Sequence, residues 1–383
     1  MELSADMAPA GNSPQAVSAG PREDDLSVGI GLASLGFLLA GLGPAVVLLA
    51  AELHQPREHL VLLSSAFGAG LLLVAVIGPM VMRAGAGRVL RVAAIAVALG
   101  TVAMATTRLL PAVSAGALLV GLGGALMVLV TPVLIQGRAA AARLTRVNAI
   151  ASATGICAPV AIGTLEHLGV HGRFALLAPL PALLVLAIRR PVPSPGGRPS
   201  HTARTPLPAA GRAVAGWVRI VLAVSCEFCF VIWGVARIQD TGASTASAAA
   251  LSSAFPIGMA IGRLAGVRLA GRSGAVLAGC LTAAAGTGLV YASQSPWPVT
   301  IGLAIAGLGT AVLYPVTLAQ FVGTPGLAPR HSASLGALAS GAAVLAAPGL
   351  LAALDGFLSL RVAFLLPIPV LVALLILTPR SRT

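Results

Sequence analysis

Charged side chains are scarce in this chain. Only 9% of its 383 residues are charged, whereas 57% are hydrophobic, and the mean hydropathy is +0.96. A soluble domain usually carries about a quarter charged residues, so this composition excludes an ordinary soluble fold. The hydrophobic residues come in long blocks, and a block of about 20 residues spans the hydrocarbon core of a bilayer as a helix. The sequence therefore predicts an all-α membrane protein rather than a barrel of alternating strands.

Lysine is absent, and all 24 basic residues are arginines. Without lysine there is no phosphate-binding Gly-x-x-x-x-Gly-Lys motif, so we do not expect an ATP-driven pump on this chain. A net charge of +13 would suggest nucleic acid as the partner of a soluble protein. Here the arginines lie in short segments between apolar blocks, which is typical of charge that orients a protein in a membrane. We therefore expect a lipid bilayer and no nucleic acid as a partner. The arginine-only, Ala/Gly/Pro-rich composition also indicates a GC-rich bacterial genome.

The chain has only four cysteines, all within apolar blocks. Cys226 and Cys229 have the spacing of a redox or zinc pair, but no second pair and no histidine lies near them in the sequence. We expect them to pack as small apolar side chains, with no metal site and no cofactor apart from a coupling proton. An intramembrane enzyme would need paired catalytic groups at one depth, and the sequence offers none, so catalysis is not expected.

Twelve apolar blocks are long enough to be membrane helices, and the arginines between them set the orientation. If the N-terminus lies in the cytoplasm, nineteen arginines fall on the cytoplasmic side and five on the opposite side. Both termini are therefore predicted to be cytoplasmic, in the inner membrane of a bacterium. The predicted helices are residues 28–51, 59–82, 89–107, 112–136, 147–166, 174–189, 215–236, 247–268, 275–293, 297–321, 332–354 and 359–378.

The predicted domains are two six-helix halves and three polar segments. Residues 1–27 are polar, acidic near their end and without the order of a signal peptide, so we expect a disordered cytoplasmic tail. Residues 28–189 and 215–378 form the halves. Residues 190–214 are rich in Pro, Ser and Arg, which predicts a solvated cytoplasmic linker. Residues 379–383 form a short cytoplasmic tail.

The two halves repeat one another in sequence. The segment 121–125, Gly-Leu-Gly-Gly-Ala, recurs as Gly-Leu-Gly-Thr-Ala at 307–311, an offset of 186. The segments that begin at Arg173 and Arg361 also match, at an offset of 188. Both copies of each segment run in the same predicted direction through the membrane. We therefore predict parallel repeats, related by rotation about the membrane normal.

The residues from Gly78 onward carry the most diagnostic motif. They keep Gly78, Arg83 and Gly85 of a pattern that reads glycine, three residues, an acid, an arginine, one residue and a glycine, followed by basic residues such as Arg88. Met82 occupies the position of the acid. With two parallel halves and a central linker, this motif resembles the major facilitator superfamily over residues 28–378.

In the second half, Gly262, Arg263 and Arg268 are similar to the helix 8–9 loop of that family. The run from Glu227 to Trp233 is similar to a branch of its bacterial members, without pointing to a substrate. We expect the glycines and arginines of both loops to lie where the cytoplasmic ends of the halves meet. There they would either gate the protein or only set its topology.

The resemblance implies a monomeric secondary transporter that moves a small organic solute by alternating access. A transport-inactive membrane sensor or assembly protein is the alternative, favoured by Met82 and by the isolated charge of Glu227. A channel would usually need rings of residues from several subunits.

Glu227 is the leading candidate for a solute- or proton-binding group. It lies near the centre of the seventh predicted helix, where a carboxylate is costly unless it faces a cavity or a partner. Helices 1, 4, 7 and 10 line the cavity in proteins that this chain resembles. Trp233, close by, fits either that cavity or anchoring at the lipid interface.

Three uncharged polar residues are further candidates for contact with the solute. Gln136 and Gln320 lie near the inner ends of the fourth and tenth predicted helices, and Tyr314 lies within the tenth. Hydrogen bonds between helices are an equally good reason for their presence.

The predicted topology can be tested with reporter fusions placed after Arg212 and at the C-terminus. Because nineteen of the 24 arginines fall on one side, both fusions should report a cytoplasmic location. A periplasmic signal at either point would overturn the arrangement.

Overall fold

The computed structural model describes residues 23–53, 61–135, 140–189, 210–269, 274–325, 327 and 329–378. All the regular elements in these ranges are helices. Ten are long and apolar enough to cross a membrane, and Leu62–Gly78 and Gly172–Ile188 are shorter apolar helices. Together they give the twelve crossings expected from the sequence. The prediction of an all-α membrane protein is therefore confirmed.

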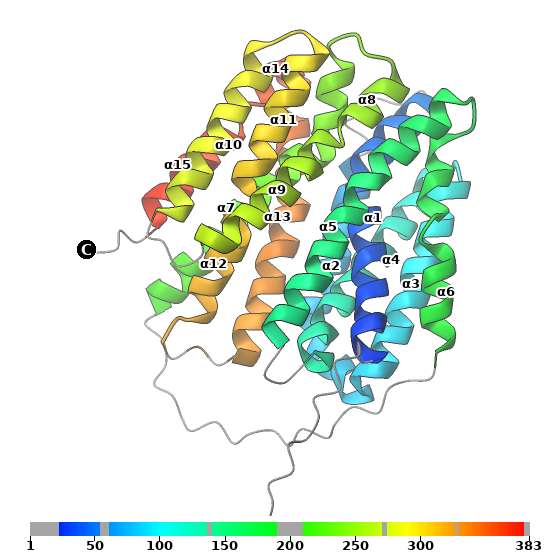
Figure 1. The fold of residues 1–383 in the computed structure, drawn as a ribbon, viewed down its shortest axis with the longest axis vertical. Helices are drawn as coiled ribbons and strands as arrows, with labels where there is room; N and C mark the ends of the chain where they lie inside the picture. Colours follow the sequence, from blue (N-terminus) through cyan, green and yellow to red (C-terminus); the bar gives the residue numbers. More distant parts are fainter. Residues whose placement is uncertain are drawn as a thin grey trace, which may run out of the picture.

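The first half contains six crossings and forms the right-hand part of Figure 1. Its elements are α1 (Glu23–Leu53), α2 (Val61–Val81), the short η2 (Met82–Ala84), α3 (Ala86–Thr106), α4 (Leu110–Leu134), α5 (Ala140–His167), η3 (Gly172–Leu177) and α6 (Leu180–Ile188).

The second half repeats this order on the left of Figure 1. Its elements are α7 (Ala210–Gln239), α8 (Thr245–Leu251), α9 (Ala254–Leu269), α10 (Ala275–Ala292), α11 (Pro296–Thr310), α12 (Leu313–Val322), α13 (Pro329–Phe357), α14 (Leu360–Ala363) and α15 (Pro367–Leu377).

Prolines divide several of the crossings into two helical pieces. Pro315 has no N–H to donate to the carbonyl of Ala311, and α11 and α12 are separated at that point. Pro179 and Pro367 lie between η3 and α6 and at the start of α15, 188 residues apart. The sixth and twelfth crossings are thus interrupted at equivalent positions, as expected for repeats.

Several helices begin earlier than the sequence predicts, and two of them, α1 and α7, begin inside the predicted polar segments. α1 begins at Glu23, inside the predicted tail, because Asp25 has a partner: the Arg143 side chain on α5 donates from its Nε to both carboxylate oxygens at 2.7 Å. α7 begins at Ala210, inside the predicted linker, and runs without a break to Gln239. Residues 1–22 and 190–209 lie outside the described residues, so the rest of the tail and the linker remains a prediction.

The repeat in sequence is also a repeat in packing. Gly121 of α4 and Gly307 of α11 each lie against a backbone carbonyl of the neighbouring helix, those of Phe67 and Phe255. A Cβ on either glycine would overlap that oxygen. The two glycines are 186 residues apart and the two phenylalanines 188, the same offsets that the sequence shows. The same helix crossing is therefore built twice.

A second glycine pair repeats in the same way. Gly100 of α3 and Gly116 of α4 face each other, and a Cβ on Gly100 would lie 2.5 Å from the Gly116 oxygen. In the second half, Gly286 and Gly302 form the equivalent crossing between α10 and α11, at 2.6 Å. Small residues let helix backbones approach closely where lipid supplies no hydrophobic drive for association.

The halves meet along three sets of helices. α1 packs against α7, α2 against α13, and α5 against α8 and α9. In the repeat, α2 of the first half corresponds to α8 and α9 of the second, and α5 corresponds to α13. The contact of α2 with α13 is therefore equivalent to the contact of α5 with α8 and α9. This is the arrangement of two parallel repeats around an axis between them.

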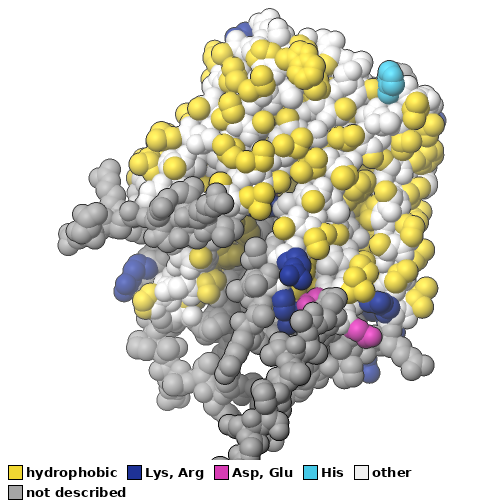
Figure 2. All heavy atoms as spheres, in the orientation of Figure 1, with side chains coloured by type: hydrophobic (Ala, Val, Ile, Leu, Met, Phe, Trp, Pro, Cys, Tyr) yellow, Lys and Arg dark blue, Asp and Glu magenta, His cyan; other side chains and the backbone are white. Residues whose placement is uncertain are grey.

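The surface has the character of a protein that lies in a bilayer. Many large apolar side chains are exposed, among them Leu99, Leu264 and Ile376. On the face shown in Figure 2, an apolar band covers most of the helices, while arginines and carboxylates gather toward the lower end of the view. This distribution matches a membrane-embedded helical body.

We predict that Gly121→Ala and Gly307→Ala each destabilise the protein, because the added Cβ would overlap a backbone oxygen and force the helices apart. Overpacking of this kind costs about 1–3 kcal/mol. Thermal unfolding of the purified protein in detergent measures the loss.

Gly288→Ala on α10 is the matched control, because nothing lies within 4 Å of a Cβ at that position. It should unfold at or slightly above the temperature of the wild type, since alanine favours a helix over glycine. Equal unfolding temperatures for all three variants would contradict the packing role.

Candidate functional site

Glu227 lies on α7, one of the helices through which the halves meet. α7 packs against α11, α12, α13 and α15 of its own half and against α1 of the other half. The residue as a whole is partly exposed, and its carboxyl group interacts electrostatically with Arg263 on α9 and with Tyr314 on α12. Glu227 is therefore not an isolated charge, as the sequence suggested, because the fold brings a guanidinium from another helix near it.

Arg263 links the two halves. Its Nη1 donates a hydrogen bond of 2.5 Å to the Oγ of Ser152 on α5, and the two residues are 111 positions apart. Ser152 in turn donates to the carbonyl of Asn148 at 2.9 Å. The sequence identified Arg263 but gave no sign of Ser152, since nothing in a run of small residues marks one serine as the partner of a distant arginine.

Tyr314 contributes a hydroxyl to the same region. Its side chain is hydrogen-bonded to Ser340 on α13, and Ser340 donates to the carbonyl of Gly336 at 3.1 Å. Glu227 thus interacts electrostatically with Arg263 and Tyr314, and these two residues bond in turn to Ser152 of α5 and Ser340 of α13. Of the sequence candidates, Glu227, Tyr314 and Arg263 belong to this group.

Trp233 lies apart from these polar groups. Its side chain is buried, and its Nε1 donates to the carbonyl of Pro348 on α13 at 3.1 Å. The indole therefore ties α7 to α13 within the second half and does not lie at the lipid interface.

Gln320 lies near the end of α12 and accepts a hydrogen bond of 2.9 Å from Arg219 of α7. This contact fits the helix-bridging alternative considered for it. Arg219 itself is buried, although its position in the sequence suggested only an orienting charge. Gln136 lies outside the described residues.

In the loop motif of the first half, the glycines are in constrained positions and the arginines are exposed. Gly85 has a φ of 92°, a conformation that favours glycine, at the start of α3. Gly78 is buried, and a Cβ there would lie 2.9 Å from a methyl carbon of Leu129 on α4. Arg83 and Arg88 are exposed. The two glycines thus have structural reasons for their presence, whereas a gating role for the arginines stays a prediction.

The corresponding glycine of the second half also packs closely. A Cβ on Gly262 would lie 2.5 Å from the carbonyl oxygen of Leu308 on α11. Arg268 lies one residue before the end of α9, and its side chain is outside the described set.

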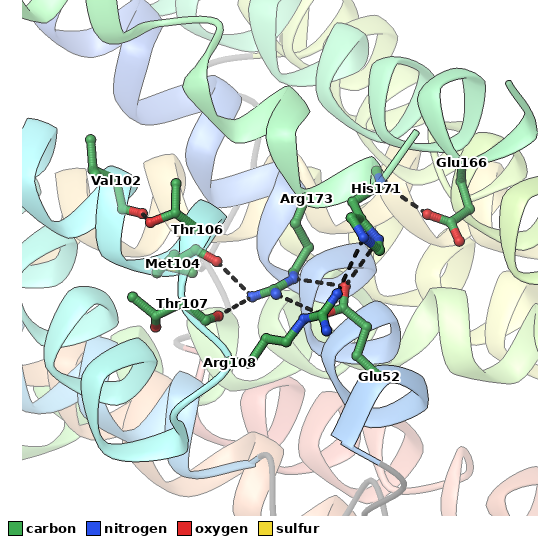
Figure 3. A network of polar contacts seen from close by, with 10 residues as sticks. Glu52, Val102, Met104, Thr106, Thr107, Arg108, Glu166, His171 and Arg173 are labelled. Carbon is green, nitrogen blue, oxygen red and sulfur yellow. Dashed lines mark hydrogen bonds and ion pairs between the residues drawn. The ribbon is translucent and has the colours of Figure 1, made fainter. Parts of the chain in front are cut away.

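A buried ion pair at the other end of the molecule was not expected from the sequence. Arg173, at the start of the sixth crossing, is only 4% exposed and holds both oxygens of Glu52, at 3.0 and 2.6 Å. Its Nη1 donates to the carbonyls of Met104 and Thr107, at 2.9 and 2.8 Å. Figure 3 shows these bonds converging on Arg173, with Arg108 and His171 also beside the Glu52 carboxylate. Arg173 therefore ties α1 to the end of α3.

The second half caps the end of α10 in a similar way. Arg361 donates to the carbonyl of Tyr291 at 2.6 Å and stacks over its ring, and Arg237 donates to the carbonyls of Val290 and Ser293. Cations at a helix C-terminus satisfy carbonyls that have no partner within the helix. The repeat of Arg173 and Arg361 was visible in the sequence, but this shared role was not.

Comparison with known proteins gives a clear result for the fold alone. No protein-family model matches this chain, and no curated protein is recognisably similar to it in sequence. Among solved structures, it is similar to the nucleoside transporter NupG, with a TM-score of 0.72 and 13% identity over 92% of this chain and 98% of that one. It is also similar to the human organic anion transporter MFSD10 (TETRAN), with a TM-score of 0.64 and 17% identity over 94% and 100%.

We predict that Arg173→Gln strongly destabilises the protein. The substitution leaves the Glu52 carboxylate without its closest partner and two helix-end carbonyls without a donor. Breaking a buried pair in this way costs about 3–5 kcal/mol. Thermal unfolding in detergent is the measurement.

Arg108→Gln is the control, which tests whether the loss of stability in Arg173→Gln depends on the burial of the arginine. The Arg108 side chain is 64% exposed and lies 3.7 Å from the same carboxylate, so its removal should cost at most about 1 kcal/mol. If both variants unfolded at the same temperature, the assigned role of Arg173 would be wrong.

Proposed function

We propose that this chain, which has the major facilitator superfamily fold, is a secondary transporter that moves a small organic solute across the cytoplasmic membrane by alternating access. The proposal is supported by the electrostatic interactions of Glu227 on α7 with Arg263 on α9 and Tyr314 on α12, and by the hydrogen bond from Arg263 to Ser152 of the other half. Ionisable groups at membrane depth are costly and mark solute or ion pathways. A scaffold without transport would have no need to gather them there.

Glu227 is the proposed proton carrier. A carboxyl group at the junction of the halves can ionise when water reaches it and take up a proton when the halves close around it. Each state of the protein then binds the proton differently, which is the condition for a proton gradient to shift the balance between the states. Arg263 and Tyr314 adjust this balance, because both interact with the charge of Glu227.

The two similar structures support an organic solute. One is described as a nucleoside transporter and the other as an organic anion transporter. These substrates differ in charge, so the fold by itself does not choose between them.

A transport-inactive sensor or assembly protein is the competing proposal, and Met82 in the loop motif still favours it. The bond from Arg263 to Ser152 weakens that reading, because it places a polar contact across the junction whose rearrangement transport requires. The test below separates the two.

Glu227→Gln should abolish solute accumulation driven by a pH gradient while leaving solute exchange intact. The amide keeps the size and hydrogen bonding of the carboxyl group but cannot carry a proton. The measurement uses proteoliposomes with radiolabelled uridine and benzoate, comparing pH-driven uptake with counterflow at equal pH on both sides.

Glu23→Gln is the control, since Glu23 is an exposed carboxylate at the start of α1. It should retain both activities. Full pH-driven uptake by Glu227→Gln would remove this residue from coupling, and a protein that binds solute without exchanging it would favour the sensor.

A further inference from the structure

The helices α3 and α6 pack against each other at the outer edge of the first half (Figure 1). α3 carries a row of exposed apolar side chains, separated by three or four residues and therefore on one face of the helix. This row consists of Val92, Ile95, Leu99 and Val102, which are 37–60% exposed. On α6, the exposed apolar side chains are Leu184, Val185 and Ile188. In a protein that spans a membrane, contiguous exposed apolar surface of this kind lies against lipid.

Three arginines lie where these two apolar faces end, on the side of the molecule that we predict to be cytoplasmic. Arg88 is exposed and lies four residues before Val92, so it continues the row of α3. Arg189 is exposed and directly follows Ile188 at the end of α6. Arg91 connects the two helices, because its Nη2 donates a hydrogen bond of 2.7 Å to the carbonyl of Arg189. The three arginines are therefore brought to one place by two helices whose contacting residues are 98 positions apart.

No carboxylate of the described residues forms an ion pair with these three arginines. The arginines that form such pairs within 4.0 Å are Arg108, Arg143, Arg173 and Arg237. At the same end of the molecule, Asp25 is paired with Arg143 of α5. Arg91 bonds to a neutral carbonyl, and Arg88 is a neighbouring like charge three residues away on the same helix. An anion from outside the chain would relieve this repulsion.

The dimensions of the surface match those of a phospholipid in one leaflet. From Arg88 to Leu99, α3 advances about 17 Å along its axis. Half of the hydrocarbon core of a bilayer is about 15 Å thick. A planar guanidinium also matches the oxygens of a phosphate group in a bidentate manner. Cations at the end of an apolar face thus fit a molecule with an anionic head and apolar chains better than they fit a free anion.

We propose that α3 and α6 form a binding site for an anionic phospholipid. Arg88, Arg91 and Arg189 hold its phosphate, and its acyl chains lie along the exposed apolar faces of the two helices. Basic residues between membrane helices on the cytoplasmic side are suited to anionic headgroups. The inference does not depend on the proposed transport function, because it involves neither a solute nor a proton.

An orienting role alone is the competing explanation for these arginines. Orientation depends on how many basic residues lie on each side of the membrane. It does not require that three of them lie together beside an apolar face. The two explanations differ in the lipid that they predict to be bound.

The experiment measures the binding of single lipids to the purified protein in detergent by native mass spectrometry. The probes are phosphatidylglycerol, which is anionic, phosphatidylcholine, which is zwitterionic, and glycerol 3-phosphate, which has the phosphate without acyl chains. Phosphatidylglycerol should bind with the lowest Kd, because it alone combines a net negative charge with apolar chains. Glycerol 3-phosphate should bind more weakly than phosphatidylglycerol.

Variants assign the binding to the arginines. Arg88→Gln and Arg189→Gln should each raise the Kd for phosphatidylglycerol about fivefold, the effect of one basic residue near an anionic headgroup. Both side chains are exposed, so the variants should fold. Arg88→Lys should retain more of the binding than Arg88→Gln, because the ammonium keeps the charge but not the planar fork.

Arg212→Gln is the matched control. It removes the same charge from an exposed position near the start of α7, in the other half. The Kd for phosphatidylglycerol should stay at its wild-type value in this variant. An equal change in Arg212→Gln and Arg88→Gln would show that only total charge matters and would overturn the site.

Two results in the wild type would also overturn the inference. Equal Kd values for phosphatidylglycerol and phosphatidylcholine would mean that the arginines do not select an anionic headgroup. Binding of glycerol 3-phosphate as tight as that of phosphatidylglycerol would assign the arginines to a soluble phosphate instead of a lipid. Loss of proton-driven transport in Glu227→Gln with unchanged binding of phosphatidylglycerol would bear on the proposed function alone.

Discussion

The close approach of helix backbones is the constraint on which the rest of this structure depends. Lipid offers no hydrophobic gain when two apolar helices meet, so association depends on packing at short range. The crossings at Gly121 and Gly307 bring backbone against backbone, and no side chain larger than hydrogen fits there. Because the same crossing is built in both halves, it fixes α4 against α2 and α11 against the α8–α9 segment in the same way. Each half is thus closely packed along its own helices.

The arginines of this fold have two kinds of role. Buried arginines join helices within one half, whereas the exposed Arg263 joins the two halves. Arg173 and Arg237 are almost fully buried and end on backbone carbonyls at the last turns of α3 and α10. Their charge is offset by Glu52 and Asp240, so they hold the helices of each half together. Arg263 is exposed and reaches across to the other half. The first group stabilises the packing within each half, and Arg263 joins one half to the other.

The sequence predicted the crossings and the repeat because both depend on local or periodic features. Block length determines a membrane helix, and the offsets between Gly121 and Gly307 and between Arg173 and Arg361 are visible without coordinates. The side-chain contacts between distant helices could not be predicted from the sequence. Nothing in the sequence pairs Ser152 with Arg263 or Trp233 with Pro348, because these contacts join helices more than 100 residues apart. The early starts of α1 and α7 were missed for a related reason, since polar residues there continue helices that composition alone would end.

The surroundings of Glu227 change the argument for a functional charge. On sequence alone, the position of Glu227 near the centre of its helix was the whole case for a role in transport. In the structure, Glu227 is accompanied by Arg263 and Tyr314, which come from two other helices of its half, while Ser152 of the other half holds Arg263. A purely structural pair would bring Glu227 and Arg263 into direct contact, as Arg173 and Glu52 are. Because Arg263 bonds to a hydroxyl of the other half instead, no ion pair holds the carboxyl group of Glu227, which supports its proposed role as a proton carrier.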